Sequence, residues 1–377
     1  MHQEAPARHI PAHAVNLNDY AREAQACLPE ATWAYLSGGA ADELTLQANA
    51  QAWSNWQLHP RVLRPLQGAH LRTTLLARPL AHPILLAPVA AHKLAHPDGE
   101  MGVAYAAAAQ EAGLILRTQA STRLEDVSQA YLGEAGHGPL WMQLYLQADR
   151  GATLALVQRA EAAAYEALVV TVDAPVHGAR DRERRAQFQM PAGLQVNLAS
   201  PTRPSTRSPT TPSTSPPHAA SPWDALMAQA PSWDDIAWLQ TQTRLPIVLK
   251  GVLHEDDARQ ARALGVQGLI VSNHGGRSLD TAVSTAWALP RIADAVGGEL
   301  CVLVDGGIRR GTDVLKALAL GAQAVLIGRP YVYALATAGA LGVAHVLRLL
   351  QDELAMAMAL CGCPTVQDIH RDLLVRA

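Results

Sequence analysis

The stretch LCVLVDGGIRRGTDVLKALALGAQAVLIGRP, residues 300–330, contains two short apolar runs separated by a segment of helical pattern. The runs at 300–306 and 324–329 are apolar on both faces and rich in branched side chains, as is typical of strands in a parallel sheet. Between them, GTDVLKALALG spaces its apolar residues as a helix does and ends at Gly321, the residue type favoured just after a helix C-terminus. The stretch therefore predicts a strand, a helix and a second, parallel strand.

Six similar runs precede this stretch, at 84–89, 114–119, 140–145, 167–173, 246–251 and 268–273. Ala/Leu-rich segments with helical spacing, such as EDDARQARALG, separate most of them. Eight strand and helix units predict an α/β fold in which one sheet closes into a (β/α)8 TIM barrel. A doubly wound open sheet is the alternative.

Two segments lie outside this repeat. Residues 1–75 are helical in pattern around Asp19 to Trp53 and predict an N-terminal helical cap on a barrel that occupies residues 76–377. Between the fourth and fifth strands, residues 191–222 are rich in Ser, Thr and Pro, and such a composition cannot bury enough apolar surface to hold one conformation. We expect a mobile loop over the barrel mouth there, either a lid or an inert insertion.

The overall composition indicates a globular protein that acts on a small molecule. Of its 377 residues 49% are hydrophobic and 17% charged, and the net charge of −3 gives no electrostatic reason to bind nucleic acid or an anionic membrane. Four cysteines form neither a disulfide framework nor a zinc-spaced set, so we expect reduced thiols and no metal site. No signal peptide and no membrane span are expected, which predicts a cytoplasmic location.

The predicted strands end in polar residues, and the active sites of TIM barrels lie at those ends. These residues are Gln143 and Tyr145, Thr171 and Asp173, Lys250, Ser272, His274 and Arg277, and Asp305, Gly306 and Gly307. Lys250 closes an apolar run, where an unpaired ammonium group is costly to bury. It should therefore face an anion or an electron-rich ring, or form a salt bridge with Asp305.

The last two strands are followed by DGGIRRG and GRP. Their glycines let a ligand approach the backbone closely, and Arg309 and Arg329 supply positive charge. TIM barrels commonly hold a phosphate group at this position, on loop amides and a helix N-terminus. A phosphate-bearing cofactor or substrate is therefore expected.

The sixth strand continues into VSNHGGRSLD, residues 271–280. His274 can accept a proton near neutral pH, and Arg277 can bind a carboxylate through two parallel hydrogen bonds. Together they suit proton abstraction from a carboxylic acid substrate. Asp173, two strands away, could hold the imidazole and stabilise its charged form.

At these residues the chain resembles the FMN-dependent L-2-hydroxy acid oxidases and dehydrogenases, which include glycolate oxidase, lactate oxidase and the flavin domain of flavocytochrome b2. The likeness covers nearly the whole chain. It is carried, in order, by WAYLSGGAADELTLQANAQAW, LHPRVL, APVAAHKLAHPDGE, MQLY, TVDAPVHGARDRE, LPIVLKGV, VSNHGGRSLD, DGGIRRGTDVLKALALGA and IGRP. The resemblance implies FMN as cofactor and an L-2-hydroxy acid that is oxidised to its 2-oxo acid.

The resemblance also assigns roles to residues. The catalytic group would be His274 as the base, Asp173 as the stabiliser of its imidazolium form, and Tyr145 as the partner of the substrate hydroxyl. Arg180, Arg277 and Tyr35 would hold the substrate carboxylate beside His274 and Tyr145. The residues implied for FMN are Pro88, Val89 and Ala90 near N5; Lys250 near N1; Gln143, Thr171 and Ser272 at the ring or ribityl chain; Asp305 and Gly306 at the ribityl hydroxyls; and Gly307, Arg309, Gly328 and Arg329 at the phosphate.

Three positions depart from the family pattern. Arg117 stands where the family usually has a serine that touches FMN, so that either Thr118 substitutes for it or the flavin contact differs. Gln119 replaces a residue that is often bulky and apolar, and His177 lies where several relatives carry an apolar side chain. The last two changes make the substrate end of the site more polar.

Oxygen is the simplest final electron acceptor, with hydrogen peroxide as product, and a dehydrogenase that uses a quinone or a carrier protein is the alternative. Three readings of other kinds are a non-redox flavin barrel such as an isomerase, a phosphate-binding barrel without flavin, and an inactive barrel used for binding. The presence of His274, Asp173 and Arg277 argues against the inactive barrel. A homo-oligomer, a tetramer by analogy with relatives, is expected.

Overall fold

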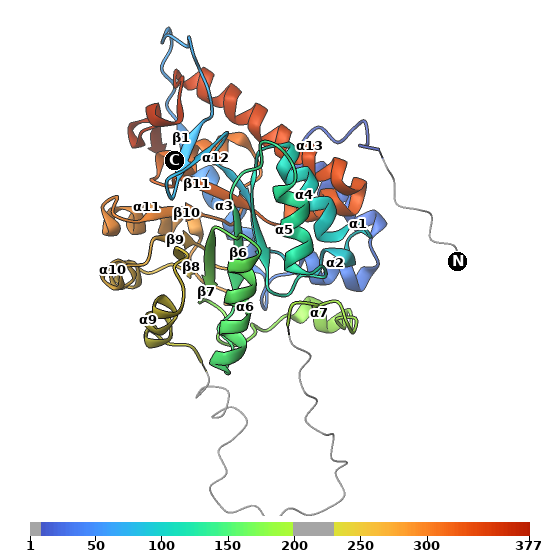
Figure 1. Cartoon of the computed structure of the whole chain (residues 1–377). Helices are drawn as coiled ribbons and strands as arrows, with labels where there is room; N and C mark the ends of the chain where they lie inside the picture. Colours follow the sequence, from blue (N-terminus) through green and yellow to red (C-terminus); the bar gives the residue numbers. More distant parts are fainter. Residues whose placement is uncertain (1–8, 199–229) are drawn as a thin grey trace, which may run out of the picture.

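The computed structural model describes residues 9–198 and 230–377. Eight parallel strands form a closed barrel in the order β10-β11-β4-β5-β6-β7-β8-β9 (Figure 1). The strands are β4 (Ile84–Leu86), β5 (Gly113–Arg117), β6 (Leu140–Leu144), β7 (Ala167–Thr171), β8 (Ile247–Val252), β9 (Gly268–Val271), β10 (Cys301–Val304) and β11 (Ala324–Ile327). Each overlaps one of the eight predicted runs, and only β5 and β8 extend past their run, by one residue each. The predicted (β/α)8 barrel is confirmed, and the doubly wound alternative is wrong.

A helix follows each strand. These helices are α4 (Gly99–Ala109), α5 (Leu124–Leu132), α6 (Arg150–Ala162), α9 (Trp233–Gln242), α10 (Glu255–Leu264), α11 (Thr285–Val296), α12 (Gly311–Ala319) and α13 (Arg329–Cys361), with the short α7 (Asp181–Arg185) between β7 and α9. The helix predicted between the last two strands is α12, and Gly321 lies just past its end with φ +107°. Glycine is suited to this conformation because it has no Cβ.

Alternating side chains of the strands divide the core into two layers. Leu85, Trp141 and Leu303 belong to a cluster inside the barrel, whereas Leu86, Met142 and Val304 pack between the strands and the helices. A two-residue period places successive side chains on opposite faces of a strand. Both layers are apolar, which explains why the strand sequences are apolar throughout.

The N-terminal segment is helical as predicted, with α1 (Leu17–Cys27), α2 (Glu30–Ser37) and α3 (Leu44–Ala52). It also contains strands that the sequence did not reveal. Strand β1 (Trp56–Leu58) pairs antiparallel with β12 (Leu374–Arg376), so the last strand of the chain lies against the segment that follows α3. Strands β2 (Thr73–Leu75) and β3 (Arg78–Leu80) form a hairpin that spans residue 75, where the cap was predicted to end.

Helix α13 is long and apolar enough, by length and composition, to cross a membrane. This corrects the expectation that no segment approaches the length of a span. The helix packs against α1, α4 and α12, and 67% of its most apolar window is buried in the fold. Its backbone leaves the helical region at Ala338 and at Gly339, which has φ +58°, so two helical segments meet at a kink. It is therefore the buried core helix of a barrel.

The predicted Ser/Thr/Pro-rich loop at 191–222 lies mostly outside the described residues, and only 191–198 are described. At this end the buried Asn197 is tied to the barrel. Its Oδ1 accepts a hydrogen bond from the Leu124 amide at 2.9 Å, and its Nδ2 donates to the Thr122 carbonyl at 3.0 Å. Whether the loop is a lid or an inert insertion stays untested.

Trp53 joins the N-terminal segment to the barrel and yields a test of that attachment. Its side chain is 1% exposed, and its Nε1 donates to the Gly306 carbonyl at 2.9 Å. Trp53→Ala should lower the free energy of unfolding by about 3–5 kcal/mol, because it leaves a cavity. Trp53→Phe should cost less, since it keeps most of the apolar contact. Denaturant unfolding measures both.

The matched control is Trp287→Ala on α11, where the indole is 39% exposed and lies against Arg291 on the outer surface. That change should shift the free energy of unfolding by no more than about 1 kcal/mol. Equal effects of the two alanine substitutions would contradict the role given to Trp53.

Candidate active site

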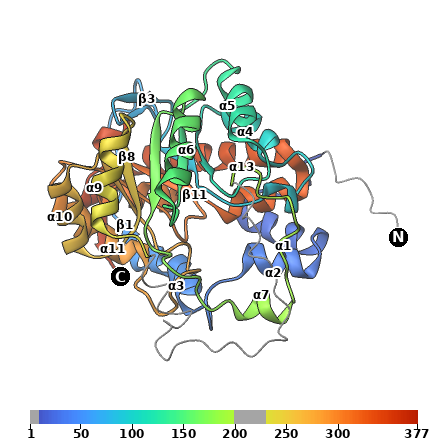
Figure 2. The same cartoon turned by 60° about the horizontal axis from the view of Figure 1, so that its bottom comes forward.

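A cavity of ≈ 1040 Å³, including its open entrance, lies at the C-terminal ends of the barrel strands. Helices α2, α3 and α7 lie on the same side of the barrel (Figure 2). Small-molecule sites commonly enclose about 300–1,000 Å³, so the cavity can hold a cofactor together with a small substrate. Of the predicted site residues, its lining includes Tyr35, Pro88, Val89, Ala90, Gln143, Tyr145, Thr171, Arg180, Lys250, His274, Arg277, Asp305, Gly306, Gly307, Arg309, Gly328 and Arg329. Asp173 and Ser272 lie behind this surface and support it.

His274 and Asp173 form the predicted pair. The chain turns sharply after β9, and His274 adopts φ +57°, which a non-glycine residue rarely takes. The turn places His274 Nδ1 3.0 Å from Asp173 Oδ1, so an Nδ1–H donates to the carboxylate and Nε2 remains for the substrate. The His274 amide donates to Ser272 Oγ at 3.1 Å, which holds the turn.

The electrostatics keep His274 neutral and Asp173 charged. Burial lowers the pKa of His274 to about 4, although the neighbouring Asp173 acts to raise it. Burial acts to raise the pKa of Asp173, but its interaction with His274, which includes a hydrogen bond, and the charge of Lys250 lower it overall. A neutral imidazole beside a carboxylate can accept a proton at neutral pH.

Lys250 is buried and paired. Its Nζ lies 2.7 Å from Asp305 Oδ2 and donates to Ser272 Oγ at 2.7 Å, so the salt bridge weighed from the sequence is present. Burial acts to lower the pKa of Lys250, but Asp305 and Asp173 raise it overall, which keeps the ammonium charged. The second oxygen of Asp305, Oδ1, is buried without a partner and can accept a hydrogen bond from a ligand hydroxyl.

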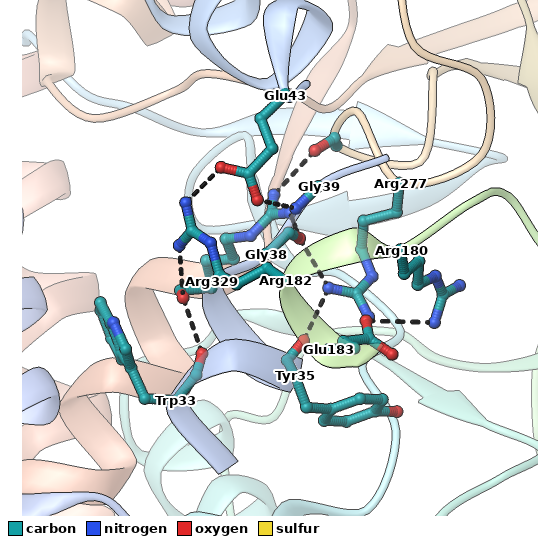
Figure 3. Close-up of polar contacts among 12 residues, drawn as sticks. Trp33, Tyr35, Gly38, Gly39, Glu43, Arg180, Arg182, Glu183, Arg277 and Arg329 are labelled. Carbon is teal, nitrogen blue, oxygen red and sulfur yellow. Dashed lines mark hydrogen bonds and ion pairs between the residues drawn. The ribbon is translucent and has the colours of Figure 1, made fainter. Parts of the chain in front are cut away.

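Arg277 lies between α2 and α7, as Figure 3 shows. Its Nη1 donates to the carbonyls of Tyr35 at 2.7 Å and Gly38 at 2.8 Å, and its Nη2 lies 2.8 Å from Glu183 Oε1. Burial, together with the charges of Arg180 and Arg329, lowers the pKa of Arg277 to about 10, so it stays charged at neutral pH. The residue predicted to bind a substrate carboxylate thus already holds a carboxylate of the protein.

Glu183 was not identified from the sequence, although it stands in the ARDRE motif. It also lies 3.5 Å from Arg180 Nη1, so both predicted carboxylate-binding arginines share it. The ring of Tyr35, the third predicted ligand, stacks on Phe188 with centroids 4.4 Å apart. A substrate carboxylate at Arg277 would therefore share the guanidinium with Glu183 or replace it.

Two partly buried arginines lie at the phosphate end predicted from the sequence. Arg329 donates to the carbonyls of Gly275 at 2.9 Å and Gly38 at 2.7 Å, and its Nε is buried without a partner. Arg309 donates to the Ile308 carbonyl at 2.8 Å. Burial lowers the pKa of both guanidinium groups. Because Arg329 also begins α13, an anion here would meet both side-chain charge and a helix N-terminus.

The N-terminal segment completes this end of the cavity. Gly307 has φ +80°, and a Cβ there would lie 2.0 Å from the Asn49 carbonyl oxygen. Asn49 and Asn273 exchange side-chain hydrogen bonds of 2.8 Å inside the fold. Asn49 and Leu46 line the cavity but were not predicted, because nothing in the α3 sequence indicates which face approaches the barrel.

The two residues at the β5 departure face different ways. Arg117 lines the cavity, whereas Thr118 is buried and donates from Oγ1 to the Gln143 carbonyl at 2.6 Å. Thr118 also holds the Gln143 side chain, whose Nε2 donates to Thr171 Oγ1 at 2.9 Å. Thr118 therefore fixes a predicted cofactor residue, and Arg117 is the side chain that faces the cavity.

A family model described as FMN-dependent dehydrogenase matches residues 24–376. The chain belongs to this family. It is 47% identical over 367 residues to the L-lactate oxidase of Nostoc sp., covering 96% of this chain and 98% of that one. It is 41% identical to 2-hydroxyacid oxidase 1 of Homo sapiens, covering 95% of each. A crystal structure of mandelate oxidase with (S)-2-phenylpropionate has a TM-score of 0.83 at 39% identity, covering 96% of this chain and 98% of that one.

Family membership confirms the resemblance stated from the sequence and the prediction of FMN as cofactor. The cavity fits this group, because it offers an unpartnered arginine nitrogen for a phosphate and an unpartnered carboxylate oxygen for a ribityl hydroxyl. Arg309 and Arg329 would hold the phosphate and Asp305 the ribityl chain, while Lys250, Gln143 and Thr171 would hold the ring. When bound, FMN supplies a two-electron acceptor.

The phosphate assignment makes a measurable prediction. Arg309→Met removes one buried cation of the pair, so FMN should bind about 10–100-fold more weakly, as expected for the loss of a charged hydrogen bond. Fluorescence of FMN released on dilution measures the dissociation constant.

The control is Arg310→Met, which removes the same charge from the next residue. The Arg310 guanidinium is directed away from the cavity and lies 2.7 Å from Glu353 Oε1. It should leave FMN affinity within about twofold. The assignment fails if the two variants lose the same affinity.

Proposed function

We propose that the protein oxidises an L-2-hydroxy acid to its 2-oxo acid with FMN, and that oxygen is the final electron acceptor, giving hydrogen peroxide. The observation that carries the proposal is the His274–Asp173 pair in a cavity that also contains Tyr145, Arg180 and Arg277. Relatives that are named L-lactate oxidase and 2-hydroxyacid oxidase support this substrate class. Their names also favour oxygen over a quinone or a carrier protein.

Each residue has a distinct part in this reaction. His274 Nε2 accepts a proton from the substrate, and Asp173 stabilises the imidazolium that results. Tyr145 donates a hydrogen bond to the substrate hydroxyl. Arg180 and Arg277, which also contact Glu183, bind the carboxylate and place the α-carbon next to the base.

Two further expectations from the sequence are untested by a single chain. A homo-oligomer, a tetramer by analogy, and a cytoplasmic location remain predictions. The dehydrogenase alternative differs from our proposal only in the final acceptor, so the same experiment distinguishes them.

The visible spectrum of the purified protein, recorded without oxygen, tests the reaction class. L-lactate, glycolate, L-mandelate and longer L-2-hydroxy acids are added in turn, and at least one should bleach the bound flavin within the mixing time of a manual assay. Recovery of colour in air within seconds would indicate an oxidase, whereas slow recovery would indicate a dehydrogenase. A bound flavin that none of these acids bleaches would overturn the proposal.

The base assignment predicts a dependence on pH. His274 must be neutral to accept a proton, and its pKa is lowered to about 4, so kcat/KM should be flat near neutral pH. It should fall about tenfold per pH unit only below about pH 4, as the imidazole becomes protonated. His274→Ala should slow flavin reduction by about 10²–10⁴-fold and leave FMN bound.

Asp173→Asn is the companion variant. It removes the carboxylate that raises the pKa of His274. The fall of kcat/KM at acid pH, its acid limb, should therefore move to lower pH, and flavin reduction should slow. An acid limb at an unchanged pH would show that another group sets it.

A further inference from the structure

Arg117 lies at the Tyr145 end of the cavity, as the last residue of β5. Its Nη2 donates to Tyr145 Oη at 3.0 Å and to Gln119 Oε1 at 2.8 Å. Its Nε is buried and has no partner. Because the guanidinium donates to the phenol oxygen, the Tyr145 hydroxyl hydrogen is left to point at a ligand.

Arg117 forms no salt bridge within the residues that the structure describes. Across the described ranges 9–198 and 230–377, no carboxylate oxygen lies within 4.0 Å of its nitrogens. Three other cavity cations are paired, Lys250 with Asp305 and both Arg180 and Arg277 with Glu183, whereas Arg309 and Arg329 form no salt bridge within the same ranges. A partly buried, unpaired guanidinium is unfavourable unless a ligand supplies the missing charge.

When FMN and substrate are bound, their other anionic groups already have partners. The FMN phosphate belongs with Arg309 and Arg329, at the end formed by β10 and β11. The reacting carboxylate of the substrate belongs with Arg180 and Arg277. Arg117 stands apart from both pairs, so a further anionic group would match it.

The surroundings of Arg117 belong to the substrate end rather than the phosphate end. Gln119 is the polar residue that stands where relatives are often bulky and apolar. Burial is the main cause of the lowered pKa of His274 and of His177, and the charge of Arg117 also lowers both. Arg117 therefore acts electrostatically on His274, the base, and on His177, the second polar residue at the substrate end.

We propose that Arg117 binds a second carboxylate carried by the side chain of the substrate, so that the protein prefers L-2-hydroxydicarboxylic acids. This inference rests on the proposed function and narrows it. A guanidinium with unused donors can bind a carboxylate through charge-assisted hydrogen bonds, which are stronger than neutral ones. A monocarboxylic acid of the same length leaves that charge unpaired.

L-malate and L-2-hydroxybutyrate form a matched pair of test substrates, because they share a four-carbon chain and differ by a carboxylate in place of the terminal methyl group. The ratio of their kcat/KM values should favour L-malate at least about tenfold in the wild-type protein. In Arg117→Ser, which introduces the residue usual in the family, that ratio should fall at least about tenfold. Arg117→Lys should keep part of the preference, since it retains a charge without the planar fork.

Binding of unreactive acids gives a second readout that does not depend on turnover. Succinate should perturb the spectrum of the bound flavin at lower concentration than butyrate, and Arg117→Ser should remove the difference. Arg123→Ser is the matched control, because Arg123 is an exposed arginine that pairs with Glu125 away from the cavity. It should leave the ratio and both dissociation constants within about twofold.

Two results would overturn the inference and leave the proposed function intact. In the first, L-lactate or glycolate bleaches the flavin, but Arg117→Ser does not change the ratio of kcat/KM for L-malate to kcat/KM for L-2-hydroxybutyrate. The other is an equal loss with both acids in Arg117→Ser and a shifted midpoint potential of FMN, which would assign the charge to the flavin. If no hydroxy acid bleaches the flavin, the proposed function fails instead, and succinate binding still tests Arg117.

Discussion

The buried ion pair between Lys250 and Asp305 is the interaction on which the rest of the site depends. Lys250 comes from β8 and Asp305 follows β10, while Ser272, after the intervening strand β9, accepts from the same ammonium group. One cation thus connects the ends of three neighbouring strands. Removing either partner would leave a charge buried alone, which is far more costly than replacing both.

This pair also fixes the electrostatics around His274. Asp173 follows β7, the next strand in the barrel order, and Lys250 helps to keep it charged. The carboxylate then orients the imidazole through Nδ1. Base, stabilising acid and lysine are therefore set by the order of four adjacent strands. The N-terminal segment adds what the strands lack, since the Gly38 carbonyl holds both Arg277 and Arg329.

The sequence predicted the barrel because its strands are apolar on both faces, and it predicted the site because polar residues follow those strands. Side-chain partnerships were harder to foresee. That Glu183 would hold Arg277 depends on the placement of α7, and the pairing of β1 with β12 joins segments about three hundred residues apart. The kink at Gly339 is hidden in an apolar run that reads as one helix. The Ser/Thr/Pro-rich loop could be recognised only by composition.

The two kinds of arginine in the cavity imply two kinds of selectivity. Arg277 already holds a carboxylate of the protein, so a substrate carboxylate there competes with an existing ion pair and gains less than it would at an unpaired cation. Such a site binds carboxylic acids in general and discriminates weakly among them. Arg117 has no carboxylate partner among the described residues to release, so an acidic substrate side chain there gains the whole interaction. Substrates should therefore be distinguished by their side chains at β5, whereas the 2-hydroxy acid core that they share is recognised at α7.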